Sequence, residues 1–167
     1  MIAIREIQER DARAFLALRR KLDEETTFMM LEPGERLTTE EEQHEQIAGT
    51  LARDNQTILV AEAGGELAGY IEGVGGEYRR NRHSVYVTIG IRQAFAGQGL
   101  GSRLLAELEK WARGIGMHRL ELTVMVHNER AIALYKKMGF VTEGTKRHSL
   151  LVDGVHVDEY YMAKLLS

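Results

Sequence analysis

Cysteine is absent from this chain of 167 residues. Its absence excludes disulfide bonds, cysteine-ligated zinc sites and a thiol nucleophile, so any thiol chemistry has to come from a bound molecule. Proline occurs once, at Pro33, and no repeat, linker or low-complexity segment interrupts the sequence. The length is that of one ordinary domain, and we therefore expect a single domain spanning residues 1–167.

An excess of positive charge and long apolar runs are absent as well. The formal net charge is -3 and the isoelectric point is near 6.1, whereas nucleic-acid-binding domains usually carry a basic face. No apolar run approaches the ~18 residues that span a membrane, and the N-terminal stretch MIAIREIQERDAR becomes charged too early for a signal peptide. We expect no nucleic-acid partner, no membrane association and a cytoplasmic location.

The first half of the chain has the periodicity of a strand, two helices and three more strands. Residues 2–7 alternate apolar and polar side chains, and a helix-like apolar stripe follows Asp11. Thr39 and Glu42 have the spacing of a capping box, which predicts the start of the second helix. Three strand-like runs follow, TILVAEA, ELAGYIEGV and HSVYVTIGI, and the turns between them predict an antiparallel meander.

The second half predicts a helix after a glycine-rich turn, a strand at HRLELTV, a helix capped by Asn128, and two final strands. The final strands are expected to turn at Asp153-Gly154. This order of elements is typical of a mixed α/β fold.

A strand runs into a glycine-rich turn and a helix over residues 84–113. Apolar residues recur at every second position from Val85 to Ile91, and at helical spacing from Leu100 to Trp111. The sequence GQGLG lies between them, at residues 97–101. Glycines let a ligand come close to the backbone, and the unpaired amides of a first helical turn attract anionic oxygens. The junction therefore predicts a pyrophosphate site.

Other kinds of site also begin with a strand, a glycine turn and a helix. A P-loop is excluded, because Gly101 is followed by Ser102 and Arg103 and not by the required lysine. A dinucleotide site would have the spacing G-x-G-x-x-G, and Glu121 lies inside a predicted strand instead of at its end. On this stretch alone, a dinucleotide site and a turn that serves only packing both stay open.

A second motif lies downstream, in NERAIALYKKMGF at residues 128–140. Together the two motifs resemble the GNAT N-acetyltransferase superfamily. In that family a turn R/Q-x-x-G-x-G/A binds the pyrophosphate of coenzyme A, and a later helix reads N-x-x-A-x-x-L-Y-x-x-x-G-F. The matching positions of the second pattern are Asn128, Ala131, Leu134, Tyr135, Gly139 and Phe140. The first pattern departs once, because Ala96 stands where the family usually has arginine or glutamine.

The resemblance implies an α/β (α+β) fold of the GNAT type. Such a fold has a mixed, mostly antiparallel sheet of six to seven strands flanked by about four helices, with a V-shaped gap between the fourth and fifth strands. It also implies acetyl-CoA as co-substrate, and direct attack of an amine on its thioester in a ternary complex. No metal is expected, since the histidines show no metal-ligand spacing.

The tail of the chain resembles a bacterial subgroup that acetylates amino acids, polyamines or protein N-termini. The residues that carry this likeness are Glu143, Gly144, Arg147, Asp153, Gly154, Asp158 and Met162.

The resemblance also assigns site residues. The backbone amide of Ile91 would donate to the developing oxyanion, and Tyr135 would protonate the departing thiolate. Asn128 can cap its helix through its side-chain oxygen and still contact the coenzyme. The full set of expected coenzyme contacts is Ile89, Gly90, Ile91, Gly97, Gln98, Gly99, Leu100, Gly101, Ser102, Asn128 and Tyr135.

The base that takes a proton from the attacking ammonium has two candidates. Relatives often begin the fourth strand with histidine and place a carboxylate three residues later, whereas His83 is followed there by Tyr86. Glu72, on the preceding strand, is the first candidate, because a carboxylate there could reach the gap directly or through a water. His83 is the second, since an unperturbed histidine pKa near 6.5 suits the task.

Three functions stay open, and the first is favoured. They are an acetyltransferase for a small-molecule amine (an amino acid, polyamine or similar), a protein or peptide N-terminal acetyltransferase, and a non-catalytic acyl-CoA sensor. A closed acceptor pocket shaped by residues 22–38 would favour a small amine, and an open groove would favour a peptide. The resemblance and the apolar positions of EYYMAKLL near the C-terminus also predict a homodimer.

An acidic bias runs from Lys21 to Glu45, where nine acidic residues face two basic ones. The bias could attract a cationic substrate. Solvated helix faces, and acidic residues that are favourable at a helix N-terminus, explain it better.

Overall fold

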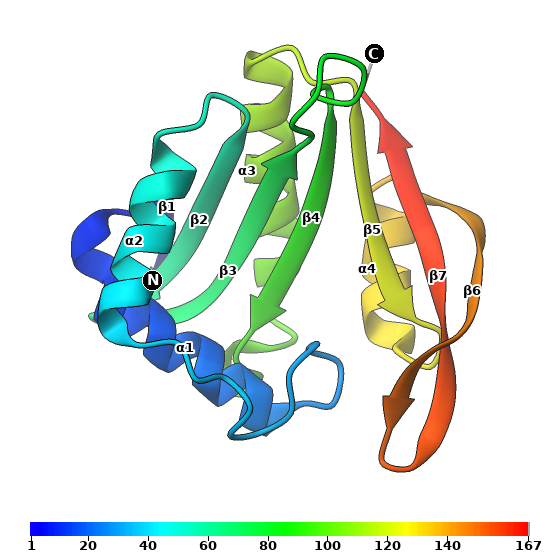
Figure 1. Ribbon diagram of the computed structural model, residues 1–167, viewed down its shortest axis with the longest axis horizontal. Helices are drawn as coiled ribbons and strands as arrows, with labels where there is room; N and C mark the ends of the chain where they lie inside the picture. The colour runs from blue at the N-terminus through cyan, green and yellow to red at the C-terminus, as the bar shows by residue number, and fades with distance from the viewer. Residues whose placement is uncertain (167) are drawn as a thin grey trace.

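The computed structural model describes residues 1–166 and contains one seven-stranded sheet in the order β1-β2-β3-β4-β5-β7-β6 (Figure 1). The strands are β1 (Ile2–Glu6), β2 (Gln56–Ala63), β3 (Glu66–Gly75), β4 (Ser84–Ile91), β5 (Arg119–Met125), β6 (Val141–Val152) and β7 (Val155–Leu165). The helices are α1 (Ala12–Glu25), α2 (Glu40–Leu51), α3 (Leu100–Gly114) and α4 (Glu129–Lys137), with short 3-10 turns η1 (Glu9–Asp11) and η2 (Gln93–Phe95). All neighbouring strands are antiparallel except β4 and β5. The predicted fold class is confirmed.

Local sequence signals set several element boundaries. The Thr39 hydroxyl accepts a hydrogen bond from the backbone N–H of Glu42 at 3.1 Å, and the Glu42 carboxylate accepts one from the backbone N–H of Thr39 at 3.0 Å. This capping box starts α2, as predicted. Asp153 and Gly154, with φ of +50° and +78°, form the two-residue turn between β6 and β7, which needs left-handed backbone at both positions.

Two helices cover each face of the sheet (Figure 1). α1 and α2 pack on one face, in a core cluster that includes Phe15 and Leu22. α3 and α4 pack on the opposite face, in a larger cluster that includes Leu104, Leu108 and Tyr135. On the α1 side, no helix of residues 1–166 lies over β5 and β7, so that part of the sheet is open (Figure 1). None of these helices is both long and apolar enough to cross a bilayer.

β4 and β5 separate after a short stretch of pairing. They pair only over Ser84–Tyr86 and Arg119–Glu121. β4 meanwhile stays paired with β3 as far as Ile91. Beyond Tyr86 the two strands therefore diverge and leave a V-shaped gap (Figure 1). This confirms the predicted gap between the fourth and fifth strands.

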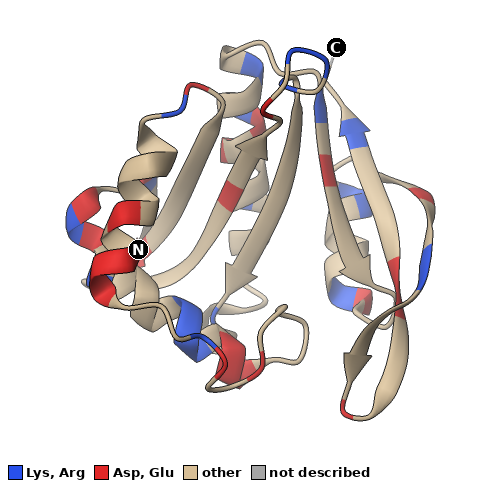
Figure 2. Ribbon diagram, viewed as in Figure 1, with Lys and Arg blue, Asp and Glu red and all other residues tan. Residues whose placement is uncertain are grey.

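The acidic bias of residues 21–45 follows from local structure. Asp23 is buried and forms an ion pair with Arg36, with 2.8 Å between oxygen and nitrogen. Glu25 pairs with Arg92 at 3.4 Å, and glutamates 40–42 lie in the first turn of α2, where the helix dipole favours them. Figure 2 shows acidic residues along α1 and α2, and none on β4. These partners support the structural explanation over attraction of a substrate.

Candidate active site

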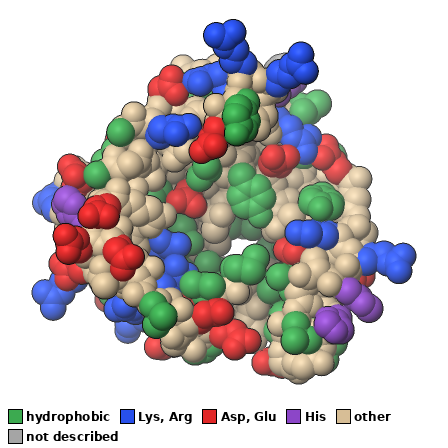
Figure 3. Space-filling model, viewed as in Figure 1, with side chains coloured by type: hydrophobic (Ala, Val, Ile, Leu, Met, Phe, Trp, Pro, Cys, Tyr) green, Lys and Arg blue, Asp and Glu red, His purple; other side chains and the backbone are tan. Residues whose placement is uncertain are grey.

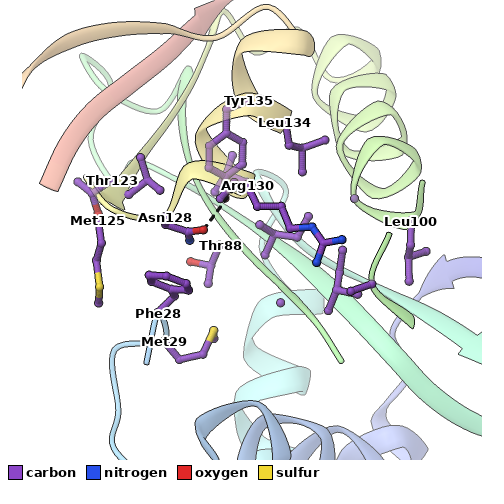
Figure 4. A pocket seen from close by; sticks show the side chains of 18 of the residues that line it. Phe28, Met29, Thr88, Leu100, Thr123, Met125, Asn128, Arg130, Leu134 and Tyr135 are labelled. Atoms are coloured by element: carbon purple, nitrogen blue, oxygen red, sulfur yellow. Dashed lines mark hydrogen bonds between the residues drawn. The ribbon is translucent and has the colours of Figure 1, made fainter. Parts of the chain in front are cut away.

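The gap between β4 and β5 holds a cavity of about 570 Å³. Its walls come from residues 86–91 of β4, most of residues 95–102, the end of β5, the start of α4, and residues 28–30 between α1 and α2. Figure 3 shows a hollow in the middle of this face of the molecule, and Figure 4 shows the side chains around it. The volume is in the usual range of small-molecule sites.

Every second backbone amide of β4 faces the gap. The N–H of Arg92, just past the strand, donates to a carbonyl of β3 at 2.9 Å. Because backbone groups alternate in direction along a strand, the N–H groups of Ile89 and Ile91 point away from β3. β5 has diverged at that height and does not pair with them. The Ile91 amide, expected as an oxyanion donor, is thus one of two donors along this edge.

The glycine turn presents free backbone amides at the start of α3. Gly97 and Gly99 have φ of +76° and +79°, and Gly99 occupies the N-cap position without any side-chain cap. The first turn of α3 contains no acidic residue, whereas α2 begins with a capping box and α4 is capped by the side chain of Asn128. Two left-handed glycines that flank Gln98, together with an uncapped helix N-terminus, form a cradle for an anion. A pyrophosphate fits these residues.

Packing explains some of the glycines and not others. A Cβ on Gly101 would lie 2.7 Å from Cδ2 of Leu134, so this glycine lets α3 approach α4. A Cβ on Gly90 would lie 2.7 Å from Cδ1 of Leu22, so this one lets α1 approach β4. A Cβ on Gly99 would meet nothing within 4 Å. Packing alone therefore does not account for the turn.

Arg130 supplies a positive charge that the sequence motifs do not predict. It lies in the first turn of α4 and extends toward the glycine turn, where its Nη2 is 3.0 Å from the position of a Cβ on Gly97 (Figure 4). Ala96, where the family usually has arginine or glutamine, offers no charge. The motif N-x-x-A marks the position of Arg130 only as a variable residue, so the pattern gave no signal for it.

Tyr135 lies on α4 with its ring between the core and the cavity (Figure 4). It is 6% exposed, and no group in residues 1–166 hydrogen-bonds its hydroxyl. Burial raises the pKa of Tyr135 well above its usual value, and the nearby Tyr86 raises it further. The hydroxyl therefore keeps its proton at neutral pH and can donate it to a group in the cavity.

Tyr86 and Thr123 join the two walls at the closed end of the gap. The Tyr86 hydroxyl and Thr123 Oγ1 are 2.8 Å apart, and both residues line the cavity. In the sequence, Tyr86 stands out only as the replacement of a carboxylate. Its partner is 37 positions away, so the pair depends on the pairing of β4 with β5.

The two candidate bases lie in different surroundings. Glu72 is opposite Thr88 in the β3–β4 pairing, and Thr88 lines the cavity. Burial raises the pKa of the Glu72 carboxyl, and the positive charge of Arg19 offsets part of this rise. His83 is exposed in the turn before β4, with its ring 6.1 Å from that of His118, and it does not line the cavity. The structure therefore favours Glu72 as the base closer to the gap.

The connection between α1 and α2 crosses the open end of the V. Phe28 from this connection meets His127, two residues after the end of β5, with 5.1 Å between ring centroids. Met29 and Met30 follow it along the cavity wall (Figure 4). None of these residues stood out in the sequence, because their role depends on a contact across the gap.

Most of the expected coenzyme contacts gather around this one cavity. Gln98 and the base candidates Glu72 and His83 are not part of its wall. Glu159, a buried carboxylate on β7 that lines the cavity, is not predicted by any sequence motif. No group of three or more His, Cys, Asp or Glu in residues 1–166 is arranged to hold a metal ion. The expected contacts that line the cavity are Ile89, Gly90, Ile91, Gly97, Gly99, Leu100, Gly101, Ser102, Asn128 and Tyr135.

Known proteins resemble this chain in sequence and in fold. The sequence profile described as "Acetyltransferase (GNAT) family" matches residues 10–140. The L-amino acid N-acetyltransferase AaaT of Escherichia coli is 35% identical over 111 residues, which are 64% of this chain and 67% of that protein. The N-alpha-acetyltransferase RimI of Mycobacterium tuberculosis is 38% identical over 116 residues, which are 68% and 69% of the two chains. The crystal structure of a GNAT-family acetyltransferase from Streptococcus pneumoniae superposes with a TM-score of 0.96 at 34% identity, over 100% of both chains.

Proposed function

Because the chain belongs to the GNAT acetyltransferase family, we propose that it moves an acetyl group from acetyl-CoA to the primary amine of a small molecule. Family membership makes it an acyl-CoA-dependent N-acetyltransferase and disfavours the non-catalytic sensor. The observation that supports a small acceptor is the contact of Phe28 with His127, which crosses the open end of the gap. Because this contact restricts the opening of the gap, the site suits an amino acid, a polyamine or a similar amine better than a peptide chain.

Different residues of the gap bind the coenzyme and stabilise the charge that develops during the reaction. Acetyl-CoA supplies an activated acyl group as a thioester. The amides at the start of α3 bind its pyrophosphate, and the free amides of β4 hold its arm along the strand edge. One of these, assigned to Ile91, donates to the thioester carbonyl oxygen as negative charge develops there. Asn128 contacts the coenzyme with the part of its side chain that does not cap α4.

Glu72 and Tyr135 carry out the two proton transfers of the reaction. The Glu72 carboxylate takes a proton from the acceptor ammonium, directly or through a water, so that a neutral amine can attack. Its raised pKa makes it a stronger base than an exposed glutamate. Tyr135 gives its proton to the departing sulfur, which its own raised pKa allows at neutral pH.

A panel of amines tests this function. Release of free thiol from acetyl-CoA would be followed with amino acids, polyamines, simple alkylamines and peptides with free N-termini. The proposal expects turnover with one or more small amines and little with peptides. The likeness to RimI supports the alternative of a peptide acceptor, and turnover with peptides alone would establish that alternative. No transfer to any amine would contradict the enzyme itself.

Replacing Glu72 by glutamine is expected to lower kcat/KM and to flatten its rise with pH. In the parent, kcat/KM should increase with pH as the Glu72 carboxyl loses its proton. Because the pKa of this carboxyl is raised, the increase should occur at a higher pH than is usual for a glutamate. A general base contributes ~10²- to 10⁴-fold, which sets the size of the loss. Initial rates between pH 5 and 9 would measure it. Glu66→Gln, an exposed glutamate on the same strand, is the matched control. Parallel pH profiles in the parent and Glu72→Gln would show that Glu72 is not the general base.

Replacing Arg130 by glutamine is expected to weaken acetyl-CoA binding by about three- to tenfold, since a charged donor near phosphate oxygens is lost. The loss should shrink at high salt, because this side chain is exposed. Calorimetric titration at two salt concentrations would measure it. Lys137→Gln removes the same charge from the other end of α4 and should change affinity little. Equal effects of the two substitutions would mean that net charge, and not position, is responsible.

Three further expectations stay proposals. The single domain of residues 1–167, the cytoplasmic location and the homodimer rest on the sequence and the family. The apolar positions of EYYMAKLL do not argue for a dimer by themselves. β7 lies between β5 and β6, and Met162 and Ala163 are buried within its own sheet.

A further inference from the structure

Glu159 is a buried acid without a basic partner. Within residues 1–166, the acidic side chains that are less than a tenth exposed are Asp11, Asp23 and Glu159. Asp11 pairs with Arg5 and Asp23 pairs with Arg36, both at 2.8 Å between nitrogen and oxygen. Glu159 is 5% exposed, and no basic group of the described chain comes within 4.0 Å of it. A buried carboxylate is normally paired, because taking an isolated charge out of water is costly.

The surroundings of Glu159 leave part of its carboxylate free. Its Oε1 accepts a hydrogen bond from the Ser149 hydroxyl at 2.8 Å. Lys146 faces it across β6 and β7, but the lysine is exposed and makes no ion pair with it. Glu159 lines the cavity, so its small exposed fraction opens there. A cation that entered the cavity could therefore complete its hydrogen bonds and its charge.

Glu159 lies on the face of the sheet from which an acceptor would enter. It is opposite Met125 in the β5–β7 pairing, so the two side chains share a face. Thr123, two residues before Met125, shares that face as well and bonds to Tyr86. Tyr86 in turn is on the same side as Thr88, whose partner in β3 is Glu72. Two carboxylates thus lie on this face of the sheet on opposite sides of the gap, Glu72 on β3 and Glu159 on β7.

Apolar side chains also contribute to the cavity that Glu159 lines. Four of them are Phe28, Met29, Met125 and Leu150. Such side chains suit a methylene chain.

From this arrangement we propose that Glu159 binds a second ammonium group of the acceptor, so that the preferred acceptors are aliphatic diamines and related dications. This inference rests on the proposed function. The reacting amine must lose its proton before it attacks, and Glu72 is the residue assigned to accept this proton. The ammonium at Glu159 keeps its proton and holds the acceptor by charge.

A pair of matched acceptors tests the inference. 1,4-Diaminobutane and butylamine share the same four-carbon chain and differ by one ammonium group. In the parent, kcat/KM should favour the diamine by about tenfold or more, as expected for one charge-assisted contact. Glu159→Gln should reduce the preference to about twofold or less. Glu107→Gln removes the same charge from the exposed side of α3 and should keep the preference. A parent that uses both amines equally would overturn the inference without any variant.

Thermal melting with coenzyme A bound separates the inference from the proposed function. The diamine should raise the melting temperature of the parent more than butylamine does, and Glu159→Gln should abolish the difference. Without acceptor, Glu159→Gln should melt at the same or a higher temperature, because a buried unpaired charge is removed. A lower melting temperature with an unchanged diamine effect would show a structural glutamate and contradict the inference. Glu159-dependent binding of diamine with no acetyl transfer to any amine would contradict only the proposed function.

Discussion

Replacing Tyr135 by phenylalanine is expected to lower kcat by ~10²- to 10⁴-fold while leaving affinity for acetyl-CoA within a few-fold. The ring keeps its place in the core, where it packs against Phe140 with 5.8 Å between centroids. Only the hydroxyl is lost, and no protein group in residues 1–166 bonds to it. The energetic loss should therefore fall on the step in which the departing sulfur needs a proton.

Turnover and coenzyme affinity would be measured on the same folded preparations, with melting temperature as the check on α4. Tyr160→Phe is the matched control, since that tyrosine lies on β7, packs at the edge of the same core and does not line the cavity. If Tyr135→Phe melts earlier but turns over at the parental rate per folded molecule, the tyrosine is structural and the sulfur takes its proton from elsewhere.

Replacing Gly99 by alanine is expected to weaken acetyl-CoA binding by tenfold or more. The methyl group would project into the open space at the start of α3, where the phosphate has to approach the backbone. The left-handed conformation of Gly99 adds a cost in stability of ~1–2 kcal/mol for a residue with a Cβ. Titration calorimetry measures the first effect, and thermal or chemical unfolding measures the second.

Gly116 offers a control with the same backbone conformation. It has φ of +77° just after α3, and a Cβ there would also meet nothing within 4 Å. Gly116→Ala should lose a similar amount of stability and keep its affinity for acetyl-CoA. If the two variants bind the coenzyme equally well, the cradle is not at Gly99.

The parts of the fold and site that the sequence predicted are those encoded by neighbours along the chain. The capping box of Thr39 and Glu42, the turn at Asp153-Gly154 and the glycine turn are each set by a few adjacent residues. Their physics is local, so spacing and residue type are enough to locate them.

The parts that were missed depend on strands and loops that are distant in sequence. Thr123 reaches Tyr86 because β4 and β5 run parallel at their starts. Glu159 reads in the sequence as one of several polar residues in the final strand, and only the pairing of β7 with β5 places it at the cavity. Arg130 occupies a variable position of a known motif, so pattern matching passes over it. The acidic bias of residues 21–45 is conspicuous in the sequence, yet Asp23 and Glu25 have basic partners in the structure. Glu159 is inconspicuous in the sequence, and no basic group of residues 1–166 pairs with it.

The uncapped start of α3 and the free edge of β4 affect the stability of the protein when no acetyl-CoA is bound. The N-cap of α3 has no side-chain partner, and β4 is not paired with β5 beyond Tyr86. A ligand that binds the folded chain and not the unfolded one stabilises it by mass action, by ~2.7 kcal/mol at a concentration of one hundred times its Kd. Resistance to unfolding and to proteolysis should therefore rise and fall with the supply of acetyl-CoA. The abundance of the protein would then rise and fall with the concentration of acetyl-CoA, which is also its substrate.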